Sequence, residues 1–158
     1  MKNIIIPIFL FLISINLFSQ EIETISWAAD AESGAPYVFQ DPRIPSKLIG
    51  FEVDIINAIS KELGVDNKHF QNQWDGLIPG LKRNDYDIAI NGLEVTEDRK
   101  KEVTFSIPYY ITFQQIVVRN DAKDLNDLND LEGKIVGTLK ASLAERILVE
   151  HGDIEVRT

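Results

Sequence analysis

The most regular pattern of apolar positions in the chain is helical. Between Phe51 and Leu63 the apolar residues recur at intervals of three or four, and Gly64 stands where a left-handed residue would end a helix. We therefore expect a helix over residues 51–63. A shorter helix is expected within Trp74–Lys82, where three apolar residues share one face and Pro79 lies near its start.

Short segments typical of strands separate these helices. They alternate apolar with polar residues or form brief apolar runs bounded by turn residues. Ser142 and Glu145 have the spacing of a capping box, which predicts a further helix to about Glu150. Strands that alternate with helices predict an α/β fold with mostly parallel strands, in which ligands bind at the carboxyl ends of the strands. The expected strands cover residues 21–28, 68–71, 86–90, 134–138 and 154–156, and residues 103–105 and 111–119 are also expected to be extended.

The first 19 residues have the pattern of a secretory signal peptide. Lys2 precedes an apolar run from Ile4 to Phe18, and polar sequence begins at Ser19. The run is shorter than the roughly 20 apolar residues that a membrane-spanning helix needs, and Pro7 interrupts it. Cleavage near Ser19 would export the protein to the periplasm, and a retained membrane anchor is the alternative. Because no cysteine follows the run, the exported protein would not be a lipoprotein.

Charge and composition exclude several classes of function. The formal net charge is -9 and the pI is near 4.7, so the phosphate backbone of a nucleic acid would repel the chain. The absence of cysteine excludes disulfides and thiolate metal sites. The two histidines, His69 and His151, lie far apart in the sequence and lack a paired ligand spacing. With no phosphate-binding loop and no nucleophile motif, we expect no metal, no cofactor and no catalysis.

Candidate binding residues gather where predicted strands end or connect. Three follow the strand at 86–90, one follows the strand at 134–138, and two aromatic residues lie in segments that connect strands. Because parallel strands present their carboxyl ends at one edge of the sheet, a single site could collect all of them. These residues are Asn91, Gly92 and Glu94, then Ser142, and the aromatic residues Tyr37 and Trp74.

Five motifs together carry a family resemblance. In their order and spacing they resemble the bacterial extracellular solute-binding proteins of family 3, the polar amino acid receptors of ABC importers. The resemblance runs from about Ile22 to Thr158. The motifs are Gly50–Asp54, Trp74–Leu81, Asp85–Asp87, Thr96–Lys100 and Phe105–Tyr110.

This resemblance implies a periplasmic binding protein-like type II fold. Such a fold has two lobes with mixed, mostly parallel sheets, joined by hinge strands that let the lobes close over an amino acid. Residues 20–112 would form the N-terminal part of lobe 1. Residues 113–158 would begin lobe 2, which the chain leaves incomplete at Thr158.

The resemblance also implies roles for individual residues. Arg99 would hold the α-carboxylate of the ligand, since a guanidinium can bind a carboxylate through two parallel hydrogen bonds. The carbonyl of Gly92 would meet the α-ammonium, and the turn at Ser142 would contact the carboxylate from lobe 2. The alternatives are a surface Arg99 that pairs with Glu97 or Asp98, and a Ser142 that only caps a helix.

Glu94 departs from the family pattern, because many relatives carry serine or threonine at this position. A carboxylate there would face a cation of the ligand or would pair with Arg99, because a buried charge without a partner is costly. Trp74 and Tyr37 would flank the ligand side chain, with packing inside the lobe as the alternative.

We therefore expect an exported, monomeric protein that binds a polar amino acid, with a cationic one favoured, and delivers it to a membrane ABC permease that is separate or fused. Two other kinds of protein share the fold that the resemblance implies. One is the ligand-sensing domain of a membrane signalling protein, and the other is an enzyme similar to cyclohexadienyl dehydratase, for which Glu94 would be the candidate acid.

Overall fold

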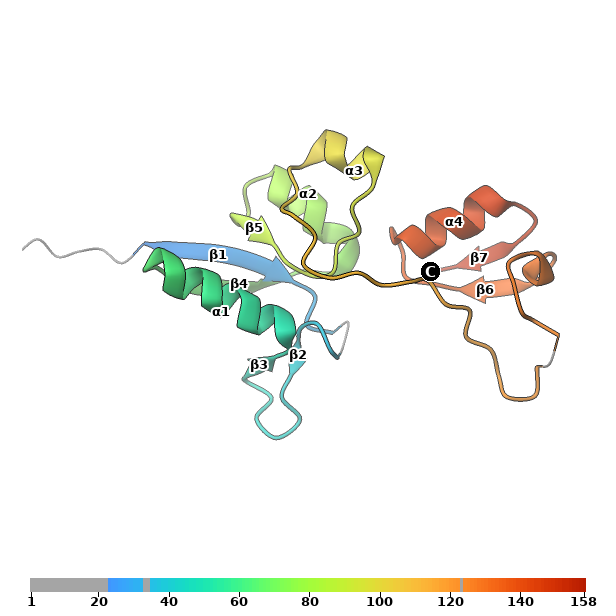
Figure 1. Ribbon diagram of the computed structural model, residues 1–158, viewed down its shortest axis with the longest axis horizontal. Coiled ribbons are helices and arrows are strands. Elements are labelled where there is room, and N and C mark those ends of the chain that lie inside the picture. The colour runs from blue at the N-terminus through green and yellow to red at the C-terminus, as the bar shows by residue number, and fades with distance from the viewer. Residues whose placement is uncertain (1–22, 33–34, 123) are drawn as a thin grey trace, which may run out of the picture.

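The computed structural model describes residues 23–32, 35–122 and 124–158. The elements form an N-terminal part and a C-terminal part, which an extended segment connects (Figure 1). The N-terminal part contains β1 (Thr24–Ala29), β2 (Phe39–Gln40), β3 (Leu48–Ile49), α1 (Phe51–Leu63), β4 (Asp66–Gln71), the 3-10 turn η1 (Trp74–Gly76), α2 (Leu77–Lys82), β5 (Ile88–Ala89) and α3 (Glu97–Glu102). The C-terminal part contains the 3-10 turn η2 (Asn129–Leu131), β6 (Ile135–Gly137), α4 (Leu143–His151) and β7 (Glu155–Arg157).

The predicted signal peptide, residues 1–19, lies outside the described residues. Among the helices that the structure describes, none combines the length and the apolar character needed to cross a membrane.

Strand β1 is the centre of the N-terminal part. It pairs in parallel with β4 on one side and with β5 on the other, so the sheet has the order β4-β1-β5. Strands β6 and β7 also pair in parallel, whereas the short β2 and β3 are antiparallel. The mixed, mostly parallel arrangement expected from the sequence is confirmed.

Alternation along β1 divides the core into two layers. Trp27 and Ala29 pack with Ile56 of α1 on one face of the sheet, while Ala28 packs with Leu77 of α2 on the other face. The strand is therefore covered on both sides, which fits a parallel sheet with helical connections. Parallel pairing puts the carboxyl ends of β1 and β5 at the same edge of the sheet, so the loops that follow these strands lie together.

Helix α1 has the bounds that its apolar period predicts. Gly64 adopts a left-handed conformation with φ 71° and its N–H donates to the Ser60 carbonyl, which ends the helix as expected. At the start of the helix, the N–H groups of Phe51 and Glu52 donate to the carbonyls of Pro36 and Tyr37. The loop before β2 is thereby fixed against the first turn of α1.

The Glu52 side chain at this helix start is fully buried. Its Oε1 accepts hydrogen bonds from the N–H of Gly92 at 2.6 Å and from the hydroxyl of Tyr109 at 2.5 Å. Its Oε2 has no hydrogen-bond partner among the described residues. Burial raises the pKa of the Glu52 carboxyl above its ordinary value of 4.5, and the two hydrogen bonds offset part of that rise.

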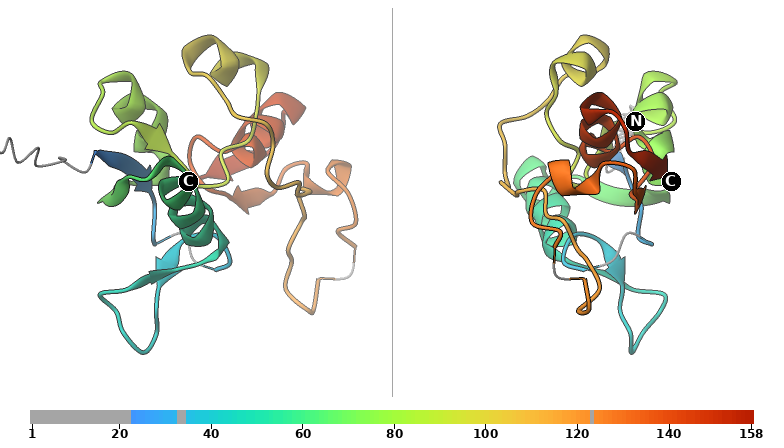
Figure 2. Two further views of the ribbon diagram at one scale, coloured as in Figure 1. Left: turned by 60° about the vertical axis from the view of Figure 1, so that its left-hand side comes forward. Right: turned by 90° about the vertical axis from the view of Figure 1, so that its right-hand side faces the viewer.

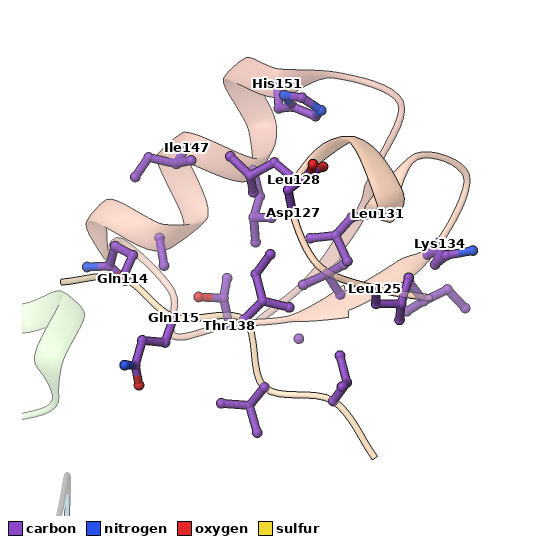
Figure 3. A pocket seen from close by; sticks show the side chains of 18 of the residues that line it. Gln114, Gln115, Leu125, Asp127, Leu128, Leu131, Lys134, Thr138, Ile147 and His151 are labelled. Atoms are coloured by element: carbon purple, nitrogen blue, oxygen red, sulfur yellow. The ribbon is translucent and has the colours of Figure 1, made fainter. Parts of the chain in front are cut away.

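The C-terminal part is built around a cavity of about 910 Å³. Figure 3 shows Leu125, Leu128 and Leu131, which share a three-residue spacing in the sequence, around this cavity together with side chains of α4. The extended segment 114–119 forms another wall. This segment and residues 103–105 were expected to be extended and form no strand, because no other described segment pairs with them. Ile111, Phe113 and Val117 of this region are largely exposed.

Leu77→Ala tests the layered core. Leu77 is fully buried, whereas Leu63, also on a helix, is 61% exposed. Because a buried truncation loses transfer free energy and leaves a cavity, we expect Leu77→Ala to lower the free energy of unfolding by about 2–5 kcal/mol. The control Leu63→Ala should change it by less than about 0.5 kcal/mol. Urea denaturation followed by circular dichroism measures both, and equal effects would contradict the packing described.

Glu52→Gln tests the buried carboxyl. A carboxyl whose pKa is raised by folding contributes its full stability below its unfolded-state pKa and loses that contribution as the pH rises through its folded-state pKa. Glutamine does not titrate, so the free energy of unfolding of the wild type relative to Glu52→Gln should fall as the pH increases from about 4 to about 8. Urea titrations across this range measure the difference. A constant difference for Glu52→Gln across this range would refute the burial argument.

Candidate functional site

The candidate site lies where the N-terminal and C-terminal parts meet. Figure 2 shows α3 and α4 close together, although they are distant in the sequence. Side chains of α3 and η1 contact the turn before α4 and α4 itself at this boundary. The carboxyl ends of β1 and β5 face the same region through the loops that follow them.

Arg99 on α3 is the central cation of this region. Its Nη1 donates to the carboxylate of Glu94 at 2.7 Å and to the Glu94 carbonyl at 2.9 Å, and its Nη2 donates to the Ala141 carbonyl at 2.8 Å. The side chain is only 13% exposed. A guanidinium has five N–H donors, and the remaining two donate to no described residue. Arg99 therefore faces inward and does not pair with Glu97 or Asp98.

Neighbouring residues explain why Arg99 points inward. The Thr96 hydroxyl caps α3 by accepting from the Arg99 N–H. The exposed acids of the first turn pair with lysines instead, Glu97 with Lys100 and Asp98 with Lys101. These surface pairs take up the acids with which a surface Arg99 would have interacted.

Glu94 forms one of the two pairings left open by its sequence. Its carboxylate accepts from Arg99 and its side chain is 21% exposed. The partly buried charge is thereby compensated. Glu94 also contributes, after burial, Tyr110 and Glu52, to raising the pKa of the Tyr37 hydroxyl.

Trp74 lies beneath the guanidinium. The Arg99 Cζ is 5.7 Å from the centre of the Trp74 ring, within the range of a cation–π contact. The ring is 9% exposed and also packs with Ala28 and Leu77 in the core. Trp74 thus supports the cation and is part of the packed interior at the same time.

Tyr37 belongs to an aromatic cluster with Phe51 and Tyr110. Its ring edge lies against Gly92, whose φ is 58°, and a Cβ added at Gly92 would be only 2.9 Å from Tyr37 Cε1. Glycine is therefore required here by backbone conformation and by space. The Gly92 N–H donates to Glu52, as described above.

Asn91 connects the two loops at the carboxyl ends of β1 and β5. Its side chain is 4% exposed, and its Oδ1 accepts from the backbone N–H of Asp30. The buried Asp30 carboxylate in turn accepts from the Trp74 N–H at 3.2 Å and from Gln71 at 3.1 Å. Asn91 thus helps to hold the loop after β1, and through Asp30 the backbone of Trp74, in place.

Ser142 caps α4, since its Oγ accepts from the Glu145 N–H at 3.2 Å. The Glu145 carboxylate accepts from the Ala141 N–H instead of the Ser142 N–H that a capping box would use. Ala141 has φ 59°, an unusual value for a residue other than glycine. Both polar groups of this residue are engaged, with its carbonyl bound to Arg99.

A cavity of about 300 Å³ lies between the starts of α3 and α4. This volume is at the lower end of the range of roughly 300–1,000 Å³ typical of ligand pockets. Arg99 and Ser142 line it, with Asp98, Glu145 and Arg146. The other predicted site residues surround Arg99 or support its neighbours but do not line this cavity.

Two exposed ion pairs add to the boundary between the two parts. Lys140 pairs with Asp75 at 2.7 Å, and Arg146 pairs with Asp98 at 3.5 Å. The hydrogen bond from Lys140 lowers the pKa of Asp75 and raises that of Lys140. Like the hydrogen bond between Arg99 and Ala141, both pairs connect the N-terminal part to the C-terminal part.

Sequence reasoning missed three participants. Asp30 directly follows β1, so the rule that selected Asn91 after β5 would also have selected it. Glu52 lies in the first turn of a helix, where an acid is common, so its sequence position does not indicate burial. Tyr109 lies within the motif Phe105–Tyr110, and nothing in the sequence distinguishes it from its neighbours. Among the described residues no group of histidine, cysteine, aspartate and glutamate could hold a metal ion.

Comparisons with known proteins place this geometry in context. The curated L-arginine-binding protein of Pseudomonas aeruginosa is 38% identical over 112 residues, which cover 70% of this chain and 42% of that protein. The L-cystine-binding protein of Escherichia coli is 33% identical over 125 residues, covering 78% of this chain and 46% of that protein. The chain thus spans less than half the length of these two relatives.

The solved structures that resemble this chain include amino acid-binding proteins as well. An ancestral arginine-binding protein bound to arginine matches with a TM-score of 0.78 at 35% identity, over 85% of this chain and 59% of that chain. An ancestral amino acid-binding protein described as a precursor of cyclohexadienyl dehydratase matches with a TM-score of 0.79 at 32% identity, over 85% and 60% of the two chains.

The likeness to these structures shows the type II periplasmic binding protein fold in this chain. The sequence profile of the bacterial extracellular solute-binding proteins, family 3, matches residues 27–157, which are most of the chain. The protein therefore belongs to the bacterial extracellular solute-binding proteins of family 3.

Proposed function

We propose that the protein binds an α-amino acid with a cationic side chain between its two lobes, outside the cytoplasm, and delivers it to an ABC permease. The observation that carries this proposal is the Arg99 guanidinium, held inward at the boundary between the two parts of the chain. Family membership supports solute binding outside the cytoplasm, and the relatives named for arginine support an amino acid as the solute.

Arg99 would receive the α-carboxylate. Its two N–H groups without a described partner can serve as donors, and charge-assisted hydrogen bonds contribute about 1.5–3 kcal/mol each. The first N–H groups of α4 have no partner within the helix and lie beside Ser142 in the same cavity. The ligand carboxylate would therefore be held from both lobes. Trp74 would keep the guanidinium flat against the core.

Glu94 and Asp30 favour a cationic ligand. Glu94 already balances the charge of Arg99. The net attraction of Arg99 for the carboxylate of a ligand is therefore weaker, unless the ligand also carries positive charge. Asp30, which holds the Trp74 backbone, places a second carboxylate near the same loops. A ligand with both an α-ammonium and a cationic side chain offsets this excess of acid. The relatives named for arginine fit this preference, while the cystine-binding relative shows that other ligands occur in the family.

Closure would bring the ligand groups together. The exposed ion pairs Lys140–Asp75 and Arg146–Asp98 join the lobes beside the cavity, so bringing the lobes together forms contacts of its own. A permease would distinguish the closed, loaded protein from the open one through the relative positions of the two lobes. The receptor is proposed to act as a monomer, with residues 1–19 as the export signal. The same site would also serve a receptor fused to its permease or a membrane-bound sensor.

One neighbour favours an enzyme as the second candidate, because that binding protein is described as a precursor of cyclohexadienyl dehydratase. Such chemistry needs a general acid aimed at the substrate. The carboxylate of Glu94 is instead bound to Arg99. Incubation of the full-length protein with prephenate separates the two candidates, because only the enzyme would release phenylpyruvate.

Arg99→Ala tests the carboxylate contact. In the full-length protein it should weaken binding of L-arginine by at least about 100-fold, because two charge-assisted bonds are lost and each factor of ten corresponds to about 1.4 kcal/mol. Arg99→Lys should bind L-arginine more tightly than Arg99→Ala but more weakly than the wild type, since lysine keeps the charge but not the planar pair of donors. Isothermal titration calorimetry measures the Kd. Arg83→Ala, which removes a surface pair with Asp85, should bind as the wild type does. Unchanged binding by Arg99→Ala would refute the assignment.

Glu94→Gln tests the charge preference. The wild type should bind L-arginine more tightly than L-citrulline, which has nearly the same shape without the charge, and more tightly than L-glutamate. In Glu94→Gln the ratio of the citrulline and arginine Kd values should shrink, because one acidic group is removed. The same ratio should be unchanged in Glu97→Gln, an exposed acid paired with Lys100. Tightest binding of glutamate by the wild type would overturn the cationic preference.

A further inference from the structure

One buried aspartate connects the carboxyl ends of all three strands of the N-terminal sheet. Asp30 directly follows β1, and its carboxylate accepts from the amide of Gln71, the last residue of β4, at 3.1 Å. Its backbone N–H donates to the Oδ1 of Asn91, two residues after β5. Because the strands are parallel, these three ends lie at one edge of the sheet. Asp30 therefore stands where the three loops meet.

The same carboxylate caps the turn that carries Trp74. Trp74 is the first residue of η1, a position where the backbone N–H has no partner within the helix. Asp30 Oδ2 accepts from this N–H at 3.2 Å, although the two residues are 44 positions apart. Gln73, at the N-cap position of η1, makes no side-chain capping bond. Asp30 thus supplies from the end of β1 the acceptor that η1 lacks locally.

The hydrogen bonds of Asp30 require an acid at this position. The partners of its carboxylate among the described residues are uncharged N–H groups: Oδ1 accepts from Glu32 and Gln71, and Oδ2 accepts from Trp74. The Gln71 amide is oriented by the Ala31 N–H, which donates to its Oε1. An asparagine in place of Asp30 would have one acceptor oxygen and one donor nitrogen, so it could not accept on both sides.

The position of η1 affects the cation of the candidate site. The centre of the Trp74 ring is 5.7 Å from the Arg99 Cζ, and Arg99 lines the cavity between α3 and α4. The ring also packs with Ala28 and Leu77 in the core. A cation–π contact depends on where the ring lies relative to the cation. A displacement of the Trp74 backbone would therefore change the support of the guanidinium.

We propose that Asp30 is a positioning residue: by capping η1 it holds the Trp74 ring against Arg99, and so fixes the guanidinium that would receive the ligand carboxylate. The inference rests on the proposed function and deepens it by adding a residue that acts on Arg99 through Trp74. Since the action passes through the Trp74 ring, it disappears when that ring is removed. An effect of the Asp30 charge on a cationic ligand would remain.

A double-mutant cycle on the full-length protein makes this distinction. Isothermal titration calorimetry gives the Kd for L-arginine in the wild type, Asp30→Asn, Trp74→Leu and the double variant. We expect Asp30→Asn to raise the Kd about fivefold or more when Trp74 is present, and less than about twofold when it is leucine. Asp54→Asn, which removes an exposed acid of α1, is the control for charge and should bind as the wild type does.

A nuclear magnetic resonance measurement without ligand reports the geometry directly. The ring current of Trp74 should displace the resonance of the Arg99 Nε–H, which is identified by its absence in Arg99→Lys. We expect Asp30→Asn to move this resonance in the same direction as Trp74→Leu does. A residue that only stabilises the fold would leave it in place.

Each outcome decides the matter. Equal rises of the Kd in both backgrounds, or an Arg99 resonance unaltered in Asp30→Asn, overturn the inference while leaving the proposed function intact. A wild type that binds no amino acid refutes the proposed function and the inference with it. Should Asp30→Asn fail to fold, Gln71→Leu takes its place, because it removes the amide that binds Oδ1 of Asp30 and leaves every charge in the chain. An unaltered Arg99 resonance in Gln71→Leu then overturns the inference.

Discussion

The Arg99 guanidinium is a single cation whose acceptors come from two parts of the chain, one of them 42 residues from Arg99 in the sequence. Glu94 holds it from the loop after β5, and the Ala141 carbonyl holds it from the turn before α4. Trp74 provides a flat apolar surface on which the group rests. Without this cation Glu94 would lose its partner, the Ala141 carbonyl would lose its donor, and the N-terminal and C-terminal parts would lose the hydrogen bond that joins α3 to the turn before α4. Among the described residues, the ion pairs Lys140–Asp75 and Arg146–Asp98 also join these two parts, and such exposed pairs are individually weak.

Much of the N-terminal part could be predicted because its signals are local. The apolar period of α1, its terminal glycine and the alternation of β1 each act over a few residues, and the structure follows them. The segment between the lobes was harder, because extended backbone becomes a strand only when another segment supplies its hydrogen bonds. Its apolar residues gave no indication of whether a described neighbour would cover them. The family was predicted from the order and spacing of the motifs, because the period of apolar residues alone does not identify a family.

The sequence predicted where several of the candidate residues lie better than it predicted which of them contact each other. Arg99, Glu94 and Trp74 do come together, but which carboxylate pairs with the guanidinium depends on side-chain directions that the sequence leaves open. Tyr37 contacts Gly92 as part of an aromatic cluster, so packing within this part of the chain accounts for its position. Asp30 and Glu52 are buried acids that only tertiary structure reveals, because a carboxyl at a strand end or a helix start is most often solvated.

Ala141 has a side chain in a conformation that most residues avoid. With φ 59° it bears a local cost that glycine would escape, on the order of 1 kcal/mol. The methyl group also removes many of the backbone conformations that glycine would sample in the unfolded chain. The peptide that faces Arg99 is thus kept in shape in advance, so little entropy is lost when that contact forms. A glycine at this position would relieve the backbone strain but leave the peptide that faces Arg99 with more conformational freedom.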